Sequence, residues 1–506
     1  MKIILLLPLA FMQVLVFAQV PGEKYPDDSA SVYHAGVPKG EVLKFRLEGS
    51  KIYPGTWRDY WIYIPAQYHP DQPACVYINQ DNIQFKAPIV FDNLINSKEI
   101  PVTIGIFVSP GRVSATDSIT ALDRFNRSFE YDGLGDQYAR FILRELLPVV
   151  EKQRASDGRS IRLSKNGNDR VIAGSSSGAI AAFTAAWEHP EEFSRVFSCI
   201  GTYVGIRGGD RYPTLIRKYE PKAIRIFLQD GNNDQNSYAG DWFKENELME
   251  RALQFSGYEV AHVWGEGAHS GGQATSIFPQ VIRWLWKDYP KPVNAGTSKN
   301  YLLQEIVLPG EGWKPVNNLQ RFTGTKQAKA TNGYVYVIEN QTANHYSKLY
   351  LITPKGKKLL CETNSNHFEG LALTPDQSQL YVAEPSSHWI WIYQINADGT
   401  LRYKQRYGWL HVPDQAENAG GCAIACDNAG HVYVATRMGV QVMDQIGKVA
   451  AMLPLPGNLP ATSLYFSGFG FSTINVVCGQ KTYSRKLNVR GISPVDSPNK
   501  PPIPKL

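Results

Sequence analysis

The sequence has 506 residues, of which 43% are apolar, 12% aromatic and 19% charged. This composition excludes collagen-like and largely disordered chains and predicts a globular protein of several domains. The net charge of +6 is spread without any run of Lys or Arg, so we expect no nucleic-acid partner. The six cysteines lack the spacing of a zinc site, and we expect no metal and no cofactor from them.

The chain starts with Met1-Lys2 and an apolar stretch that ends at Ala18. One positive charge, an apolar run too short for a bilayer span and a small residue at the end are typical of a secretory signal peptide. We therefore expect residues 1–18 to be removed and the protein to be exported to the periplasm or the medium, with no membrane anchor left. A retained anchor is the alternative. The oligomeric state stays open.

Residues 19–292 alternate short β-rich runs with amphipathic helical segments. The expected strands are 60–64, 74–78, 103–108, 171–173, 196–200, 224–228 and 260–264, and the expected helices are 135–153, 177–189, 246–255 and 276–287. Several strands are apolar on every side, as in a mostly parallel sheet covered by helices on both faces. The pattern predicts an α/β fold.

A polar linker, residues 293–300, separates this region from residues 301–492, where the helical signal almost disappears. There a turn followed by a strand recurs, with Tyr336, Tyr381, Tyr433 and Val477 lying 44 to 52 residues apart. This period is typical of β-propeller blades, and four or five blades fit the length. The Pro-rich tail, residues 493–506, is expected to be poorly ordered.

The stretch Gly174-Ser175-Ser176-Ser177-Gly178 matches the G-x-S-x-G pattern of a nucleophile elbow. A β-rich run enters the motif and an Ala-rich helical segment leaves it, which is the context that the motif requires. Such a turn exposes the Ser176 hydroxyl, and the backbone N–H of Ser177 is directed toward a developing oxyanion.

A serine hydroxyl needs a histidine base that is held by a carboxylate. The loop after the run 224–228 offers Asp230 and Asp234, and the Gly-flanked loop after 260–264 offers His269. The order nucleophile, acid, histidine is that of the α/β-hydrolases. Asp230 could instead only shape a turn, because it precedes Gly231.

Several segments resemble the enterochelin-esterase-like branch of the esterase D group of α/β-hydrolases, which includes feruloyl and acetylxylan esterases. The similar segments are 53–61, 126–132, 174–178, 206–209, 228–234 and 264–270. The resemblance spans about 250 residues. It implies that the acid lies in a G-x-x-D loop, which favours Asp234, and that the second oxyanion donor lies near Asn82.

The same resemblance places Arg127, Glu130 and Arg207 on the substrate side of the site. Structural ion pairs below the site are an equally good interpretation of these three residues. Trp242 could stack on a sugar or an aromatic acid, or pack in the core.

The second half resembles the gluconolactonase and regucalcin propellers, through segments 370–376 and 380–383. Those enzymes hold a divalent cation with oxygen ligands, and the resemblance aligns Lys326, Glu369 and Cys422 with the ligand positions. A lysine there would repel the cation. The sequence thus predicts a serine esterase for acyl or feruloyl groups on carbohydrate, or for a siderophore ester. The alternatives are a metal-dependent lactone hydrolase that uses the propeller and a catalytically silent binding module.

Overall fold

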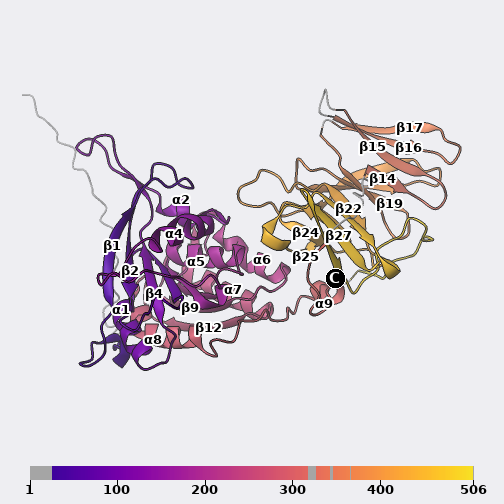
Figure 1. Cartoon of the computed structure of the whole chain (residues 1–506). Helices are drawn as coiled ribbons and strands as arrows, with labels where there is room; N and C mark the ends of the chain where they lie inside the picture. The colour runs from indigo at the N-terminus through magenta and orange to yellow at the C-terminus, as the bar shows by residue number, and fades with distance from the viewer. Residues whose placement is uncertain (1–24, 317–325, 342–345, 365, 505–506) are drawn as a thin grey trace, which may run out of the picture.

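The computed structural model describes residues 25–316, 326–341, 346–364 and 366–504, and the expected signal peptide lies outside these residues. An α/β part formed by the first half of the chain lies beside a second part of small antiparallel sheets (Figure 1). Both components of the predicted fold class are confirmed. None of the described helices is long and apolar enough to cross a membrane.

The α/β part is built on one eight-stranded sheet. Its order is β1 (Glu41–Leu47), β2 (Arg58–Ile64), β4 (Thr103–Val108), β3 (Cys75–Gln80), β7 (Arg170–Ser175), β8 (Arg195–Cys199), β9 (Arg225–Gly231), β12 (Glu259–Gly265). The six strands from β4 to β12 are mutually parallel, whereas β1 and β2 run antiparallel to their neighbours. The loops that leave the carboxyl ends of the parallel strands therefore gather at one edge, where open α/β sheets bind ligands.

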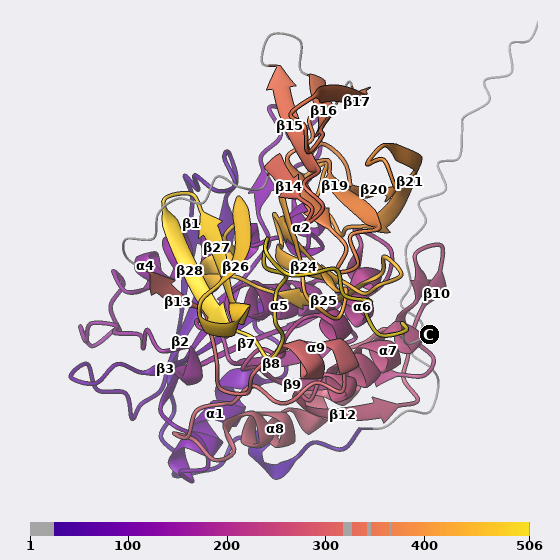
Figure 2. The same ribbon diagram turned by 90° about the vertical axis from the view of Figure 1, so that its right-hand side faces the viewer.

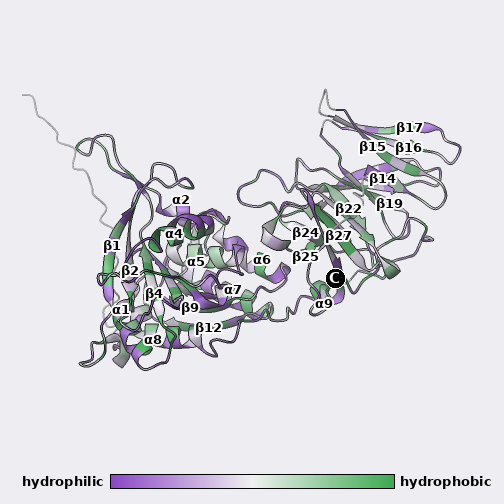
Figure 3. Cartoon of the chain, in the orientation of Figure 1, coloured by the Kyte–Doolittle hydropathy of each residue, from purple (hydrophilic) through white to green (hydrophobic). Residues whose placement is uncertain are grey.

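Helices cover both faces of this sheet. The helices on one face are α5 (Ser177–Glu188), α6 (Tyr212–Lys218) and α7 (Trp242–Phe255), and those on the other are α1 (Ala87–Asn96) and α8 (Gly272–Trp286). Successive strand residues alternate between the two cores: Ile62 faces the first and Tyr63 the second. Hydrophobic residues follow the strands and the helices packed on them (Figure 3), which is why these strands are apolar on every side.

Several local features differ from the sequence-based expectation: helices α1 and α6 were not predicted, and two further differences have a clear cause. Strand β1 was not predicted, because it lies at the sheet edge and its exposed positions carry Val42, Lys44 and Arg46. The helix expected at 135–153 is interrupted, with α3 (Gln137–Phe141) and α4 (Leu147–Val150) joined by a π-helical turn, Ile142–Leu146.

The second part contains four four-stranded antiparallel sheets among its described residues. Three of them follow chain order: β14 (Gln327–Lys329), β15 (Val335–Gln341), β16 (Tyr346–Ile352), β17 (Lys358–Asn364); β18 (Gly370–Leu373), β19 (Gln379–Ala383), β20 (Trp389–Ile395), β21 (Leu401–Trp409); β22 (Ala423–Cys426), β23 (Val432–Thr436), β24 (Gly439–Met443), β25 (Val449–Leu453). The fourth joins β26 (Ser463–Ser467), β27 (Thr473–Cys478) and β28 (Lys481–Lys486) to β13 (Lys314–Val316), which precedes all the others in sequence. Figure 2 shows the four sheets fanned out like propeller blades.

The propeller-like part docks on the end of α6. Tyr219 forms a parallel β-bridge with Met452 of β25, and Lys218 Nζ donates to His411 Nε2 over 2.9 Å. Arg485, almost fully buried, donates to both carboxylate oxygens of Glu220. These paired, partly buried contacts fix the propeller-like part against the α/β part.

Residues 493–504 of the Pro-rich tail make contacts with the rest of the chain. Asn499 N–H donates to Pro375 O over 2.8 Å, and Asp496 accepts two hydrogen bonds from Arg490 at 2.8 Å each. Proline lacks a donor but its ring packs well, and Pro501 and Pro504 line a cavity with Tyr381.

Candidate active site

Ser176 sits between the last residue of β7 and the first residue of α5, with a strained backbone at φ 58° and ψ −124°. The small residues of the motif make this turn possible. A Cβ on Gly174 would lie 2.3 Å from Gly178 O, and a Cβ on Gly178 would lie 2.9 Å from Asp81 Oδ2. Gly174 therefore cannot be replaced without moving the backbone, and Gly178 only if the Asp81 side chain shifts. The strain at Ser176 is of the kind that is stored at functional sites.

Two further loops at the same sheet edge bring a histidine and a carboxylate to Ser176. His269 Nε2 lies 2.8 Å from Ser176 Oγ, and His269 Nδ1 lies 2.7 Å from Asp234 Oδ1. The His269 side chain is 10% exposed and that of Asp234 is fully buried. Because the carboxylate accepts the Nδ1 proton, the lone pair of Nε2 faces the serine hydroxyl. In this arrangement Ser176 can act as the nucleophile, His269 as the general base and Asp234 as the acid that orients the histidine.

The loops that carry Asp234 and His269 are joined to each other. Asn232 N–H donates to Gly265 O and Asn233 N–H to Gly267 O, at 2.9 and 3.2 Å. The Asp234 carboxylate is also held by the following N–H of Gln235, at 2.5 Å. Such bonds fix the acid and the base relative to the sheet before substrate arrives.

Thr202 and Trp242 complete the surroundings of the nucleophile. Thr202 Oγ1 lies 3.2 Å from Ser176 Oγ and accepts a 3.3 Å hydrogen bond from Trp242 Nε1. The Trp242 ring meets His269 edge to face, with ring centroids 5.8 Å apart, and is almost fully buried. Trp242 thus packs behind the site. Thr202 was not predicted, because a threonine after a strand carries no recognisable signal.

The two predicted oxyanion donors belong to the elbow and to the loop after β3. The Ser177 N–H is at the N-terminus of α5, and Asn82 follows β3 with φ 80°. The Asn82 side chain accepts from Ser109 Oγ. Among the described residues, neither backbone N–H has a hydrogen-bond partner. Both groups are thus available as donors to an anion.

Arg127 and Glu130 hold this loop system together. Arg127 donates to both oxygens of Asp81, at 2.9 and 2.7 Å, and to Ser175 O at 3.3 Å. Glu130 pairs with Arg58 at 2.6 and 3.0 Å, and both side chains are inaccessible to solvent. The Arg127 guanidinium and the Glu130 carboxylate thus form ion pairs within the protein. This agrees with the interpretation of these residues as structural ion pairs.

Arg207 faces the propeller rather than the nucleophile. Its Nη1 donates to Phe129 O over 3.1 Å, and its Nη2 lies 4.0 Å from Asp414, which belongs to the propeller. Together with Gln415 these residues line a cleft of about 200 Å³.

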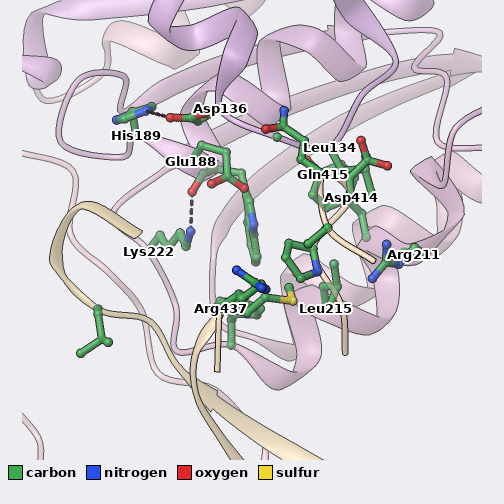
Figure 4. A pocket seen from close by; sticks show the side chains of 18 of the residues that line it. Leu134, Asp136, Glu188, His189, Arg211, Leu215, Lys222, Asp414, Gln415 and Arg437 are labelled. Carbon is green, nitrogen blue, oxygen red and sulfur yellow. Dashed lines mark hydrogen bonds and ion pairs between the residues drawn. The ribbon is translucent and has the colours of Figure 1, made fainter. Parts of the chain in front are cut away.

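A second cavity, of about 320 Å³, lies between the two parts (Figure 4). Trp187, Glu188 and His189 from the end of α5 line it, together with Lys222 and Arg437. The far end of α5 is about 16 Å from its first residue at 1.5 Å per residue, so this cavity is not the reaction site. Burial lowers the pKa of Lys222 to about 8, where its ammonium group lies over the Trp187 ring.

The residues aligned with the gluconolactonase metal ligands do not form a cation site. Lys326 Nζ lies 3.0 Å from Glu369 Oε2, and Asn340 Nδ2 donates to Glu369 Oε1 over 3.0 Å. The Cys422 thiol faces the backbone carbonyls of Ala435 and Ala461. The structure shows no group of three His, Cys, Asp or Glu that could hold a metal within the described ranges. A lysine that neutralises the only carboxylate does not fit a divalent cation.

Each half of the chain contains a region that matches the model of a known protein family. Residues 54–270 match the family model described as "Putative esterase", and residues 321–479 match the model of the SMP-30/gluconolactonase/LRE-like region. The chain thus joins an esterase-family region to a gluconolactonase-like region, as the resemblances predicted. No curated protein matches the chain.

Solved structures are similar to each half at low identity. The enterobactin esterase from Shigella flexneri is 18% identical, and the match covers 50% of this chain and 61% of that one, with a TM-score of 0.36. A ferulic acid esterase is also 18% identical, over 49% of this chain and 99% of that one, with a TM-score of 0.36. A gluconolactonase from Xanthomonas campestris is 19% identical, over 34% and 61%, with a TM-score of 0.28.

Proposed function

We propose that the protein is an exported serine esterase in which Ser176 attacks the ester carbonyl. The hydrogen-bonded series from Ser176 Oγ through His269 to Asp234 is the observation that supports this proposal. His269 Nε2 takes the hydroxyl proton during attack and returns it to the leaving alcohol. Water, deprotonated by the same nitrogen, then hydrolyses the acyl-enzyme, while Asp234 stabilises the imidazolium.

The tetrahedral oxyanion is held by the N–H groups of Ser177 and Asn82. Their free donors and the N-terminus of α5 favour negative charge at that point. Removal of one oxyanion-hole donor typically costs about 3–4 kcal/mol of transition-state stabilisation. The bidentate Arg127–Asp81 pair supports this role, because it fixes the loop that carries Asn82.

For the substrate we infer an acyl or feruloyl ester of carbohydrate, or a siderophore ester, as the sequence resemblance suggests. The cleft beside Phe129, Arg207 and Asp414 supports a hydroxyl-rich substrate, since it combines an exposed ring with a charged donor and acceptor. A panel of feruloyl, acetyl-sugar and siderophore esters on the full chain separates these classes by kcat/KM.

The apolar stretch of residues 1–18 supports the proposal of export. N-terminal sequencing of protein recovered from the periplasm or the medium tests it. A mature N-terminus near Gln19 is expected, and an intact Met1 in the recovered protein would overturn this part of the proposal.

The decisive experiment compares Ser176→Ala with Ser237→Ala, a change at an exposed serine on the nearby β10–β11 hairpin. Loss of the nucleophile lowers the rate by about 10⁶ in comparable triads, so only Ser176→Ala should abolish hydrolysis of an aryl acetate. Wild type and Ser237→Ala should also react with a fluorophosphonate probe. Equal turnover by Ser176→Ala and wild type would refute the proposal.

A further inference from the structure

The Ser176 hydroxyl has a second partner besides His269. Thr202 Oγ1 lies 3.2 Å from Ser176 Oγ, and Trp242 Nε1 donates to Thr202 Oγ1 over 3.3 Å. Thr202 is 2% exposed and Trp242 is 5% exposed, so little water reaches these bonds. Within the described ranges, Thr202 Oγ1 has no other hydrogen-bond partner. A hydrogen-bonded chain therefore runs from Trp242 through Thr202, Ser176 and His269 to Asp234.

The chemistry of the two ends fixes the direction of every hydrogen bond in this chain. The Trp242 indole N–H can only donate, and the Asp234 carboxylate can only accept. Because His269 Nδ1 donates its proton to Asp234, Nε2 keeps its lone pair and accepts the Ser176 hydroxyl proton. Thr202 Oγ1 already accepts from the indole, and its own proton is directed at the free lone pair of Ser176 Oγ.

The backbone holds Thr202 and Trp242 at the positions that this chain requires. The Thr202 N–H donates to Ser176 O over 3.3 Å, which ties the threonine to the elbow. The Trp242 N–H donates to Gln235 O over 2.9 Å, one residue after Asp234. The loop that carries the acid of the triad thus also anchors the far end of the hydrogen-bonded chain.

We propose that Thr202 is a positioning residue that donates a hydrogen bond to Ser176 Oγ and holds it in the rotamer that reaches His269. A serine side chain has three staggered positions, and two hydrogen bonds to fixed partners select one of them. Trp242 keeps the Thr202 hydroxyl turned toward the nucleophile. Hydrogen bonds aligned in one direction also polarise one another, which favours proton transfer from Ser176 to His269. The proposal rests on the esterase function proposed above.

The two half-reactions depend on this bond to different extents. During acylation, Ser176 Oγ must meet the ester carbonyl while its proton passes to His269, so its alignment affects the rate. In the acyl-enzyme, Oγ is bonded to the acyl carbon and carries no proton, and the covalent bond fixes its position. Loss of the Thr202 hydroxyl should therefore slow acylation and leave deacylation almost unchanged.

The test compares Thr202→Val, which removes the hydroxyl, with Thr202→Ser, which keeps it. Thr363→Val, at an exposed position of β17, is the matched control. An aryl carbamate separates the half-reactions: loss of activity measures attack by Ser176, and its return after dilution measures hydrolysis of the carbamoyl-enzyme. Labelling by a fluorophosphonate measures attack independently.

We expect the rate of attack to fall about tenfold in Thr202→Val, which corresponds to about 1.4 kcal/mol and thus to one hydrogen bond. Thr202→Ser and Thr363→Val should attack within about threefold of the wild-type rate. Hydrolysis of the carbamoyl-enzyme should stay within about threefold in all variants. Equal losses in both half-reactions, or a Thr202→Ser variant as slow as Thr202→Val, would overturn the proposal.

Trp242→Phe tests the preceding bond of the chain, because it removes the N–H donor and keeps a ring beside His269. We expect about a threefold loss of the attack rate in the wild-type background. In the Thr202→Val background we expect no further loss, since residues that act through one another are not additive. Additive losses would show that Trp242 does not act through Thr202 and would contradict the chain.

Crystal structures of wild type and Thr202→Val decide the question even if the esterase proposal fails. Ser176 Oγ should occupy one position in wild type and two rotamers in Thr202→Val, because one of the two bonds that hold it is gone. A single, unchanged position in both proteins contradicts the positioning role of Thr202. Absence of hydrolysis and of fluorophosphonate labelling in wild type contradicts the esterase proposal alone.

Discussion

Replacing Glu130 by glutamine tests whether this residue supports the site or binds substrate. Glu130 Oε2 accepts from Arg58 Nη1 at 2.6 Å and from the Gly111 N–H at 3.1 Å, and Oε1 accepts from Arg58 Nη2 at 3.0 Å. Both side chains of the pair are inaccessible to solvent. Whichever way the new amide turns, its NH₂ group meets a donor.

The expected magnitude follows from this burial. Removing one partner of a buried ion pair leaves the other charge uncompensated and costs about 3–5 kcal/mol. Asp59→Asn is the matched control, because Asp59 pairs with Lys44 and Arg46 at the surface, where such a pair contributes about 0–1 kcal/mol.

Urea unfolding followed by tryptophan fluorescence measures both variants, and kcat and KM are measured on the folded protein. We expect a large fall in unfolding free energy for Glu130→Gln, a small one for Asp59→Asn, and KM close to that of wild type in both. An increase in KM with unchanged stability would falsify the structural role and restore Glu130 as a substrate-binding residue.

Three other changes have defined outcomes. Asp234→Asn should lower kcat by about 10⁴ with little change in KM, since the histidine takes the wrong tautomer, whereas a chelator should leave wild-type hydrolysis unchanged. Burial, followed by the charge of Lys218, lowers the pKa of His411 to about 4, below its unfolded value near 6.5; stability should thus fall as pH drops from 6.5 to 4 in wild type but not in His411→Gln, measured by thermal unfolding. Asp414→Ala should raise KM for a bulky sugar ester but not for an aryl acetate, because it removes the partner of Arg207 from the cleft; equal effects on both esters would argue against a substrate role for the propeller.

The sequence predicted most of the parallel sheet and brought Ser176 and His269 into one hypothesis. Both predictions depend on features that lie close together in the sequence. The sheet was predicted from apolar runs, and the site from loops that begin where those runs end. The choice between Asp230 and Asp234 could not come from local chemistry, because both follow the same apolar run in sequence. The structure places Asp230 at the end of β9 and Asp234 in the loop that follows. The family resemblance favoured Asp234, and in the structure it is Asp234 that contacts His269.

Contacts between distant segments were beyond sequence reasoning. The bidentate bond of Arg485 to Glu220 joins residues 265 positions apart, and no periodicity encodes it. The edge strand β1 was missed for a different reason: its charged exposed positions resemble those of a loop.

The fourth sheet of the propeller-like part takes its outer strand from the beginning of that part. Lys314–Val316 pairs with residues 482–484, so the first and last strands of this half of the chain complete each other. Deleting either the first or the last strand of this half would remove a strand from the same sheet. The neighbouring strand would then have an unpaired edge, which favours aggregation. Truncation at residue 480 and truncation of residues 301–316 should consequently cause the same defect, although they remove opposite ends of the propeller sequence.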